Sequence, residues 1–250
     1  MGLIRILTAL LAFQSATASE FDEMKALADQ GDAVAQFNLG FMYESGNGVP
    51  ENNAEAVEWY RKAAEQGISE AQYNLAHMYQ NGEGVPENDA EAVKWLKKAA
   101  DQGLAEAQYN LGVMYANGEA VPENDAEAVK WYRKAAEQGL AVAQYNLAHM
   151  YQNGEGVPEN DSEAVKWYRK AADQGYSGAQ YNLGVMYATG EGVPENNIRA
   201  YVWWSMGKTQ GNAMAAGNID KLKPQMTPQQ IADGQALATK CYESNYKDCD

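Results

Sequence analysis

The repeating unit of this protein reads ISEAQYNLAHMYQNGEGVPENDAEAVKWLKKAADQG from Ile68 to Gly103, and its pattern recurs along the chain. The phrase AQYNLA, or a close variant of it, returns every 36 residues, and a tryptophan and a proline keep the same period. Repetition at a fixed period of this length predicts a repeat architecture, here with five full units. The recurring residues are Gln36, Gln72, Gln108, Gln144 and Gln180; Trp59, Trp95, Trp131, Trp167 and Trp203; and Pro50, Pro86, Pro122, Pro158 and Pro194.

Each unit contains two helical patterns separated by a turn. Apolar residues from Ala71 to Tyr79 recur at the spacing of one helix face, and Gly82 stands where a helix ends in a left-handed residue. Asn88 then offers an N-cap for the second helix, with Glu91 three residues on as its capping-box partner. The unit therefore predicts a helix-turn-helix.

Neither helix can bury its apolar face alone, so neighbouring units must stack to form a continuous core. Small residues in the first helix of each unit let the next helix approach closely; they are Gly40, Ala76, Gly112, Ala148 and Gly184. We expect a signal peptide at 1–18, a capping helix at 19–31, repeats at 32–67, 68–103, 104–139, 140–175 and 176–211, and C-terminal capping helices with a disulfide loop at 212–250.

This pattern resembles the Sel-one-like repeat, a relative of the tetratricopeptide repeat. The resemblance implies an all-α fold, a right-handed α/α solenoid of helix-turn-helix repeats with period 36, that binds other proteins as a periplasmic or secreted adaptor or regulator. Ala120 replaces a loop glycine, so we expect a slightly rearranged turn there, and Gly207-Lys208 replaces Ala-Ala, which suggests a looser junction with the terminal cap. The third unit carries the pattern at Ala107, Leu111, Gly112, Tyr115, Gly118, Val121, Pro122, Ala128, Trp131, Ala135, Ala136 and Gly139.

The first twenty residues have the layout of a secretory signal peptide. Arg5 precedes the short apolar run Ile6–Phe13, and Ala16–Ala18 supplies small residues for cleavage near Ala18. The run is too short for the roughly 30 Å of a bilayer core, and the alternative is an N-terminal helix of the folded domain. We expect a periplasmic or secreted protein without stable membrane insertion.

Composition and charge limit the classes of partner and the kinds of chemical site that this chain can have. The chain has 34 Asp plus Glu against 19 Lys plus Arg, a net charge of -15, which disfavours nucleic acid as a partner. Two cysteines and two histidines leave little for a metal centre, so we expect no metal and no cofactor. This composition favours an interaction protein over an enzyme, and the partner is expected to be a protein or peptide.

The first helices offer a candidate binding groove opposite their inward-facing residues. In tetratricopeptide relatives this face lines the concave groove, and rings with amides suit an extended peptide. The alternative is that the tyrosines pack between repeats and the asparagines bond locally. The three rows of groove candidates are Phe37, Tyr73, Tyr109, Tyr145 and Tyr181; Asn38, Asn74, Asn110, Asn146 and Asn182; and Phe41, His77, Val113, His149 and Val185.

The sequence gives little support for a histidine metal site or for a catalytic serine. His77 and His149 are two units apart, on the order of 20 Å given helix spacings of about 8–10 Å, which is too far for a shared metal. Ser205 and Lys208 match the short S-x-x-K pattern of penicillin-interacting enzymes, but the companion motifs are missing. We predict no catalytic residues; the alternatives are a weak β-lactamase-like or cell-wall-acting enzyme, and a purely structural spacer.

Cys241 and Cys249 lie outside the repeats in CYESNYKDC. In an oxidising compartment they are expected to form one disulfide closing a short C-terminal loop, with a redox or intermolecular role as the alternative. Because a terminal repeat unit lacks one neighbour, this bond would keep the last helix from fraying.

Overall fold

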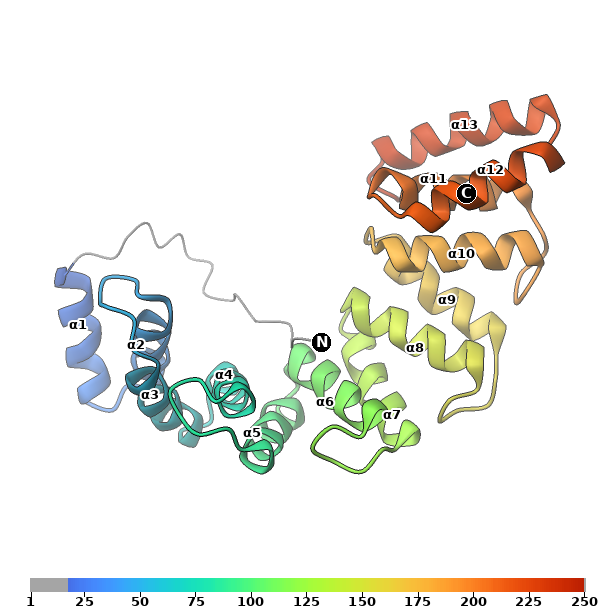
Figure 1. Ribbon diagram of the computed structural model, residues 1–250. Helices are drawn as coiled ribbons and strands as arrows, with labels where there is room; N and C mark the ends of the chain where they lie inside the picture. Colours follow the sequence, from blue (N-terminus) through green and yellow to red (C-terminus); the bar gives the residue numbers. More distant parts are fainter. Residues whose placement is uncertain (1–17, 250) are drawn as a thin grey trace. The chain divides into compact units, whose positions relative to one another are not determined.

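The structure is a computed structural model that describes residues 18–249, and this part of the chain contains helices and turns but no strand. It divides into two compact units, one up to Asn124 and one from Asp125 (Figure 1). The first unit holds α1 (Ala18–Asp29), α2 (Ala33–Ser45), α3 (Asn53–Glu65), α4 (Ser69–Asn81), α5 (Asp89–Asp101) and α6 (Ala105–Asn117). The second unit holds α7 (Asp125–Glu137), α8 (Ala141–Asn153), α9 (Asp161–Ala172), α10 (Ser177–Thr189), α11 (Asn197–Thr209), α12 (Ala213–Leu222), a 3-10 turn η1 (Lys223–Gln225) and α13 (Pro228–Glu243).

Within each unit, consecutive helices contact each other in a stack, from α1 to α6 in the first unit and from α7 to α12 in the second. Short connections between helices of similar length produce helix-turn-helix repeats of about 36 residues. The predicted all-α solenoid of helix-turn-helix repeats is confirmed. We call α2, α4, α6, α8 and α10 the first helices of their repeats, and α3, α5, α7, α9 and α11 the second helices.

The helix caps follow the local sequence, with one difference. Asn88 caps α5 as predicted, since its side chain accepts a hydrogen bond from the Glu91 backbone N–H at 3.1 Å. The Glu91 carboxylate instead accepts from Lys94 Nζ at 2.9 Å, because a cation one turn along the helix competes for it. The reciprocal capping box is formed at α13, between Thr227 and Gln230.

The loops between first and second helices keep one backbone conformation. Gly82 ends α4 with a φ of 67°, which confirms the predicted left-handed cap. Ala120 has a φ of 61°, close to the 70° of Gly84, so the expected rearrangement of this turn is not found. The loop is preserved, and the alanine adopts a backbone conformation that L-residues avoid.

The recurring glutamine is a buried clamp whose role the sequence did not indicate. Gln72 donates through Nε2 to the Ala64 carbonyl at 2.9 Å, eight residues back. Its Oε1 accepts from Gln102 Nε2 at 2.7 Å, thirty residues on. Both bonds recur at Gln36, Gln144 and Gln180. Each of these side chains therefore donates to a carbonyl at the end of the preceding helix and accepts a hydrogen bond from the glutamine near the end of its own repeat.

Small residues permit the close helix packing that the sequence predicts. A Cβ added to Gly40 would lie 2.7 Å from the Tyr60 ring, and one added to Gly184 would lie 2.5 Å from Trp204. Gly207 is also closely approached, because its added Cβ would lie 3.3 Å from Ala215 Cβ. The looser junction expected at Gly207 is therefore wrong: the missing side chain lets α12 pack tightly.

The tryptophans of the first four repeats occupy matching environments on the second helices. Lys62 Nζ lies 3.6 Å from the Trp59 ring centroid, and Lys98 Nζ lies 4.0 Å from that of Trp95. The same lysine, three residues after the tryptophan, covers Trp131 and Trp167. The fifth repeat has methionine at the lysine position, and its fully buried Trp203 is covered by Arg169 from α9 instead.

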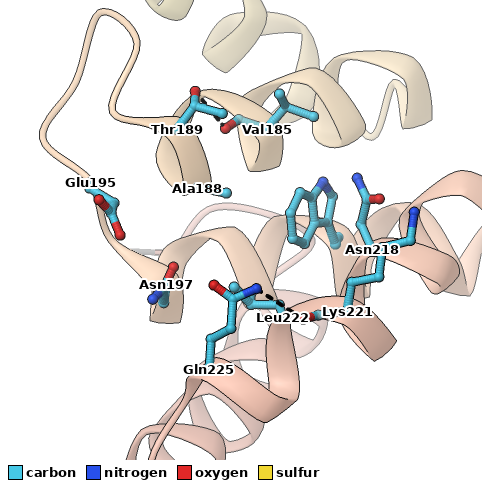
Figure 2. A pocket seen from close by; sticks show the side chains of 10 residues that line it. Val185, Ala188, Thr189, Glu195, Asn197, Asn218, Lys221, Leu222 and Gln225 are labelled. Carbon is cyan, nitrogen blue, oxygen red and sulfur yellow. Dashed lines mark hydrogen bonds between the residues drawn. The ribbon is translucent and has the colours of Figure 1, made fainter.

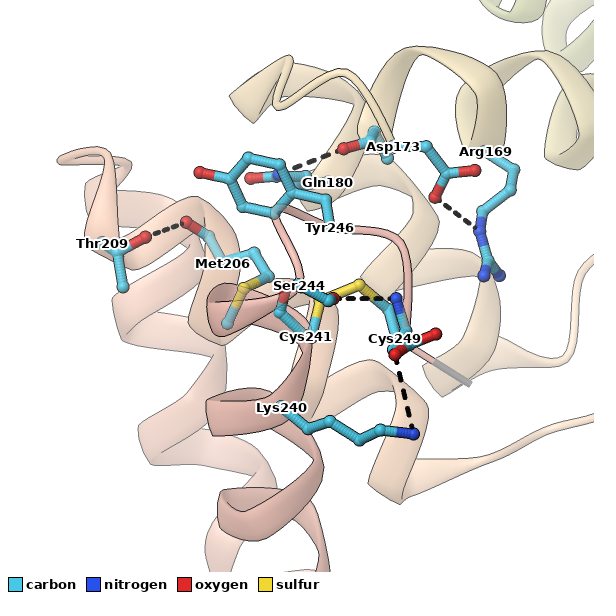
Figure 3. The surroundings of a disulfide bond; sticks show 12 residues. Arg169, Asp173, Gln180, Met206, Thr209, Lys240, Cys241, Ser244, Tyr246 and Cys249 are labelled. Carbon is cyan, nitrogen blue, oxygen red and sulfur yellow. Dashed lines mark hydrogen bonds and ion pairs between the residues drawn. A yellow bond between two sulfur atoms is a disulfide. The ribbon is translucent and has the colours of Figure 1, made fainter.

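The C-terminal cap is closed by the predicted disulfide. Cys241 and Cys249 are bonded and fully buried, next to the end of α13, which itself packs on α11 (Figure 3). The closed loop holds Tyr246 so near Gly175 that an added Cβ there would lie 2.9 Å from the ring. The loop thus fastens the end of the chain to the turn after the fourth repeat.

The segment predicted as a signal peptide lies, up to residue 17, outside the described residues. Within residues 18–249, none of the helices combines the length and apolar character needed to cross a bilayer.

Candidate protein-binding face

The structure places every groove candidate on a first helix, but it buries three of them. Tyr73 is 2% exposed and Asn110 1% exposed, and Asn110 Nδ2 donates to Tyr73 Oη at 2.8 Å. Burial raises the pKa of the Tyr73 phenol, against a smaller lowering by the Asn110 hydrogen bond. His77 is 8% exposed. For Tyr73 and Asn110, the packing alternative left open by the sequence therefore describes the observed contact.

Ring contacts also tie part of the second unit together. The Tyr145 ring centroid lies 5.6 Å from that of Tyr168 and 5.1 Å from that of Tyr176. Burial raises the pKa of Tyr168, whose hydroxyl also shares a hydrogen bond with Asn182. These tyrosines contribute to packing, although Tyr145 and Asn182 remain partly exposed.

The remaining candidates stay within reach of a partner. His149 is exposed and the others are partly exposed, so each presents a ring, an amide or an apolar edge to solvent. We refer to these residues as the candidate face. They are Phe37, Asn38, Phe41, Asn74, Tyr109 and Val113 in the first unit, and Tyr145, Asn146, His149, Tyr181, Asn182 and Val185 in the second.

The two histidines of the third row each lie beside an asparagine and a glutamate. In the first unit, Asn81 Nδ2 lies 3.1 Å from His77 Nε2 and donates to Glu83 Oε1 at 3.3 Å. In the second unit, Asn153 Nδ2 lies 3.1 Å from a ring nitrogen of His149 and donates to Glu155 Oε1, also at 3.1 Å. The loop glutamate is thereby held at the edge of the candidate face.

Metal and nucleophile chemistry gain no geometric support. Among the described residues, no three His, Cys, Asp or Glu side chains gather as a metal site would need. The Ser205 hydroxyl donates to the Tyr201 carbonyl of its own helix at 2.7 Å, and Lys208 is an exposed residue of the same helix. The S-x-x-K match thus lies within one turn of α11, with its serine hydroxyl bonded to the helix backbone.

A recess of about 270 Å³ in the second unit escaped the sequence analysis (Figure 2). Val185 of the candidate face borders it, Trp204 and Leu222 supply apolar walls, and Glu195 and Lys221 lie on opposite sides. The recess lies between α10, α11 and α12. Because α12 belongs to the C-terminal capping helices, no repeat pattern indicated which of its side chains would border the candidate face.

Helix-turn-helix repeats packed through small residues, with partly exposed rings and amides on their first helices, define an α/α-solenoid repeat protein. The Sel1 repeat model matches five consecutive segments, 33–68, 69–104, 105–140, 141–176 and 177–212. The chain therefore belongs to the Sel1 repeat family, which confirms the resemblance. Sel1 repeat proteins are in general protein-interaction modules.

Two solved structures are similar over most of the chain. A protective antigen of uropathogenic Escherichia coli, described as displaying an SLR fold, is 36% identical with a TM-score of 0.79, over 92% of this chain and 50% of that one. The chain thus spans half the length of that antigen. A Sel1 repeat protein from Oxalobacter formigenes is 34% identical with a TM-score of 0.73, over 88% of this chain and 92% of that one. The comparison with curated proteins found no significant match.

Proposed function

We propose that this protein is a non-catalytic, extracytoplasmic adaptor or regulator whose candidate face binds a protein or peptide. The observation that carries the proposal is the difference in side-chain exposure between the two helices of a repeat. The second helices of the first four repeats bury their tryptophans under their own lysines, whereas the first helices leave most of their candidate rings and amides partly exposed. Rings supply contact area and amides can pair with a partner's backbone.

The disulfide supports the extracytoplasmic part of this proposal. The bond between Cys241 and Cys249 joins the only two cysteines of the sequence. Disulfides persist in oxidising compartments such as the periplasm and the extracellular space, and they are rare in the cytosol. An N-terminal segment with the layout of a signal peptide agrees with such a location.

Site-specific photocrosslinking in the native extracytoplasmic fraction tests the binding face. A photoreactive residue is placed at Asn38 or Asn146 on first helices, and at Lys97 or Lys208 on second helices as controls. We expect discrete protein adducts from the first-helix positions only. Equal labelling from both sets, or no adduct from any position, would contradict the proposal.

The enzymatic alternative has its own test. Purified protein is assayed for nitrocefin hydrolysis beside a Ser205→Ala variant. Because the Ser205 hydroxyl bonds its own helix backbone, we expect no turnover that depends on this serine. Turnover that disappears in the variant would instead favour the enzyme.

A further inference from the structure

The five repeats separate their charges by helix. Between residues 33 and 212, every lysine and arginine lies on a second helix. The first helices and the loops that follow them carry acidic side chains and no lysine or arginine. These acidic residues are Glu44, Glu51, Glu70, Glu83, Glu87, Glu106, Glu119, Glu123, Glu155, Glu159, Glu191 and Glu195.

The lack of basic residues on the first helices runs against the charge preference of a helix C-terminus. A helix C-terminus carries a partial negative charge that a basic side chain in the last turn normally offsets. The second helices follow this rule, as with Lys62, Lys98 and Lys134 in α3, α5 and α7. No first helix has a basic residue in its last turn, and in four of the five loops a glutamate directly follows the terminal glycine.

Several lysines of the second helices already contact side chains of their own helix. Lys94 pairs with Glu91 at 2.9 Å, and Lys98 covers Trp95. The equivalent lysines of the third and fourth repeats make the same two contacts. The first helices and the loops that follow them therefore carry an excess of acidic over basic side chains, which these lysines do not contact.

Three loop glutamates are held in equivalent positions beside the candidate face. Glu83, Glu119 and Glu155 each accept a hydrogen bond from the asparagine that ends the preceding first helix, at 3.3, 2.9 and 3.1 Å. Two of them also lie near a histidine of the third row, with Nδ1–Oε2 distances of 3.9 and 3.6 Å. Their carboxylates are thus fixed at the rim of the surface that would receive a partner.

We propose that the partner segment is a cationic polypeptide, rich in lysine or arginine, that lies on the candidate-face residues of either unit with its charged ends at the loop glutamates of that same unit. This inference rests on the proposed binding function and specifies its partner chemistry. The long aliphatic stems of lysine and arginine can cover partly exposed rings such as Phe41 and Tyr109 while their heads reach the carboxylates.

Binding of a fluorescent deca-lysine peptide by the purified full chain tests this proposal, with a deca-glutamate peptide as the control probe. The test variant carries Glu83→Gln, Glu119→Gln and Glu155→Gln, which keep the hydrogen-bond acceptor and remove the charge. The matched variant carries Glu65→Gln, Asp101→Asn and Glu137→Gln, which change the net charge equally, at the same 36-residue spacing, on exposed second-helix positions.

We expect the dissociation constant for deca-lysine to rise about tenfold or more in the test variant and about twofold or less in the matched variant. Equal losses in both variants would show attraction to net charge alone and overturn the proposal. Binding of deca-glutamate as tight as that of deca-lysine would also overturn it. Adducts at Asn38 and Asn146 to a partner segment without basic residues would retain the binding function and overturn this inference alone.

Discussion

At the residue scale, a few positions determine whether each loop and each helix end keeps its conformation. Asn88 and Gly82 could be assigned from the sequence because caps depend on neighbouring backbone groups only. The clamp formed by Gln72 could not, because its partners lie eight residues back and thirty residues on. The hydrogen bond between Tyr73 and Asn110 could not be predicted from the sequence either, because it joins residues of two adjacent repeats.

Ala120 offers a direct test of the strain stored in a loop. Its φ of 61° costs an L-residue about 1–2 kcal/mol, part of which glycine would regain despite its larger unfolded-state entropy. We expect Ala120→Gly to raise the free energy of unfolding by about 0.5–1 kcal/mol in urea titrations. As the converse, Gly84→Ala should lower it, because the added Cβ would collide with the Asn53 carbonyl. A loss of stability in Ala120→Gly would refute this account.

At the element scale, the packing of neighbouring helices depends on small residues that leave room for large side chains of the next helix. Their spacing in the sequence predicted close packing, and Gly40 and Gly184 confirm it. The sequence could not indicate how closely α12 approaches Gly207, because the terminal unit has lost the repeat pattern. The recess beside α12 was missed for the same reason, whereas helices inside the repeats could be placed from their period.

The pair Gly40 and Tyr60 makes the packing rule measurable. A Cβ at position 40 would lie 2.7 Å from the Tyr60 ring, so Gly40→Ala should cost about 1–3 kcal/mol of stability. The second repeat has Ala76 and Leu96 at the equivalent positions, both buried. In a double-mutant cycle, Tyr60→Leu should therefore offset part of the Gly40→Ala loss. Strictly additive effects would show that the two positions do not interact.

The disulfide should act on the last helices alone. Closing a loop of this size contributes about 2–3 kcal/mol by the chain-entropy estimate. We expect Cys241→Ala with Cys249→Ala to speed hydrogen exchange in α13 and to leave α2 to α5 unchanged, because those helices belong to the other compact unit. Faster exchange throughout both units would contradict this local role.

At the scale of the whole molecule, both compact units depend on a buried, neutral tyrosine. Burial raises the pKa of Tyr73 in the first unit and of Tyr168 in the second above the ordinary value of 10. Because the folded state holds these protons more tightly than the unfolded state, their contribution to stability is complete below about pH 10 and declines above it.

We therefore expect the free energy of unfolding to fall as the pH rises above 10, by up to about 1.4 kcal/mol per pH unit for each such tyrosine. Urea titrations at several pH values measure this slope. In Tyr73→Phe with Asn110→Leu, which removes both hydrogen-bonding partners, the slope should be smaller. An unchanged slope in that variant would show that Tyr73 does not contribute to the alkaline loss.

The sequence predicted the fold of this protein more fully than its binding face. The period of 36 residues determines helix order and packing because each repeat contacts its neighbours in the same way. Exposure of the groove candidates varies between repeats, since Tyr73 and Asn110 are buried while Tyr145 and Asn146 are partly exposed. That difference depends on neighbouring side chains and cannot be read from one unit alone.

The claim that first helices bind while second helices hold the stack is tested most directly by measuring affinity and stability on the same variants. The partner is the protein that crosslinks at Asn38 or Asn146. Asn38→Ala with Phe41→Ala, and Asn146→Ala with His149→Ala, should weaken its binding and leave the melting temperature nearly unchanged, whereas Trp131→Ala should lower the melting temperature. Unchanged affinity in both first-helix pairs would contradict the claim.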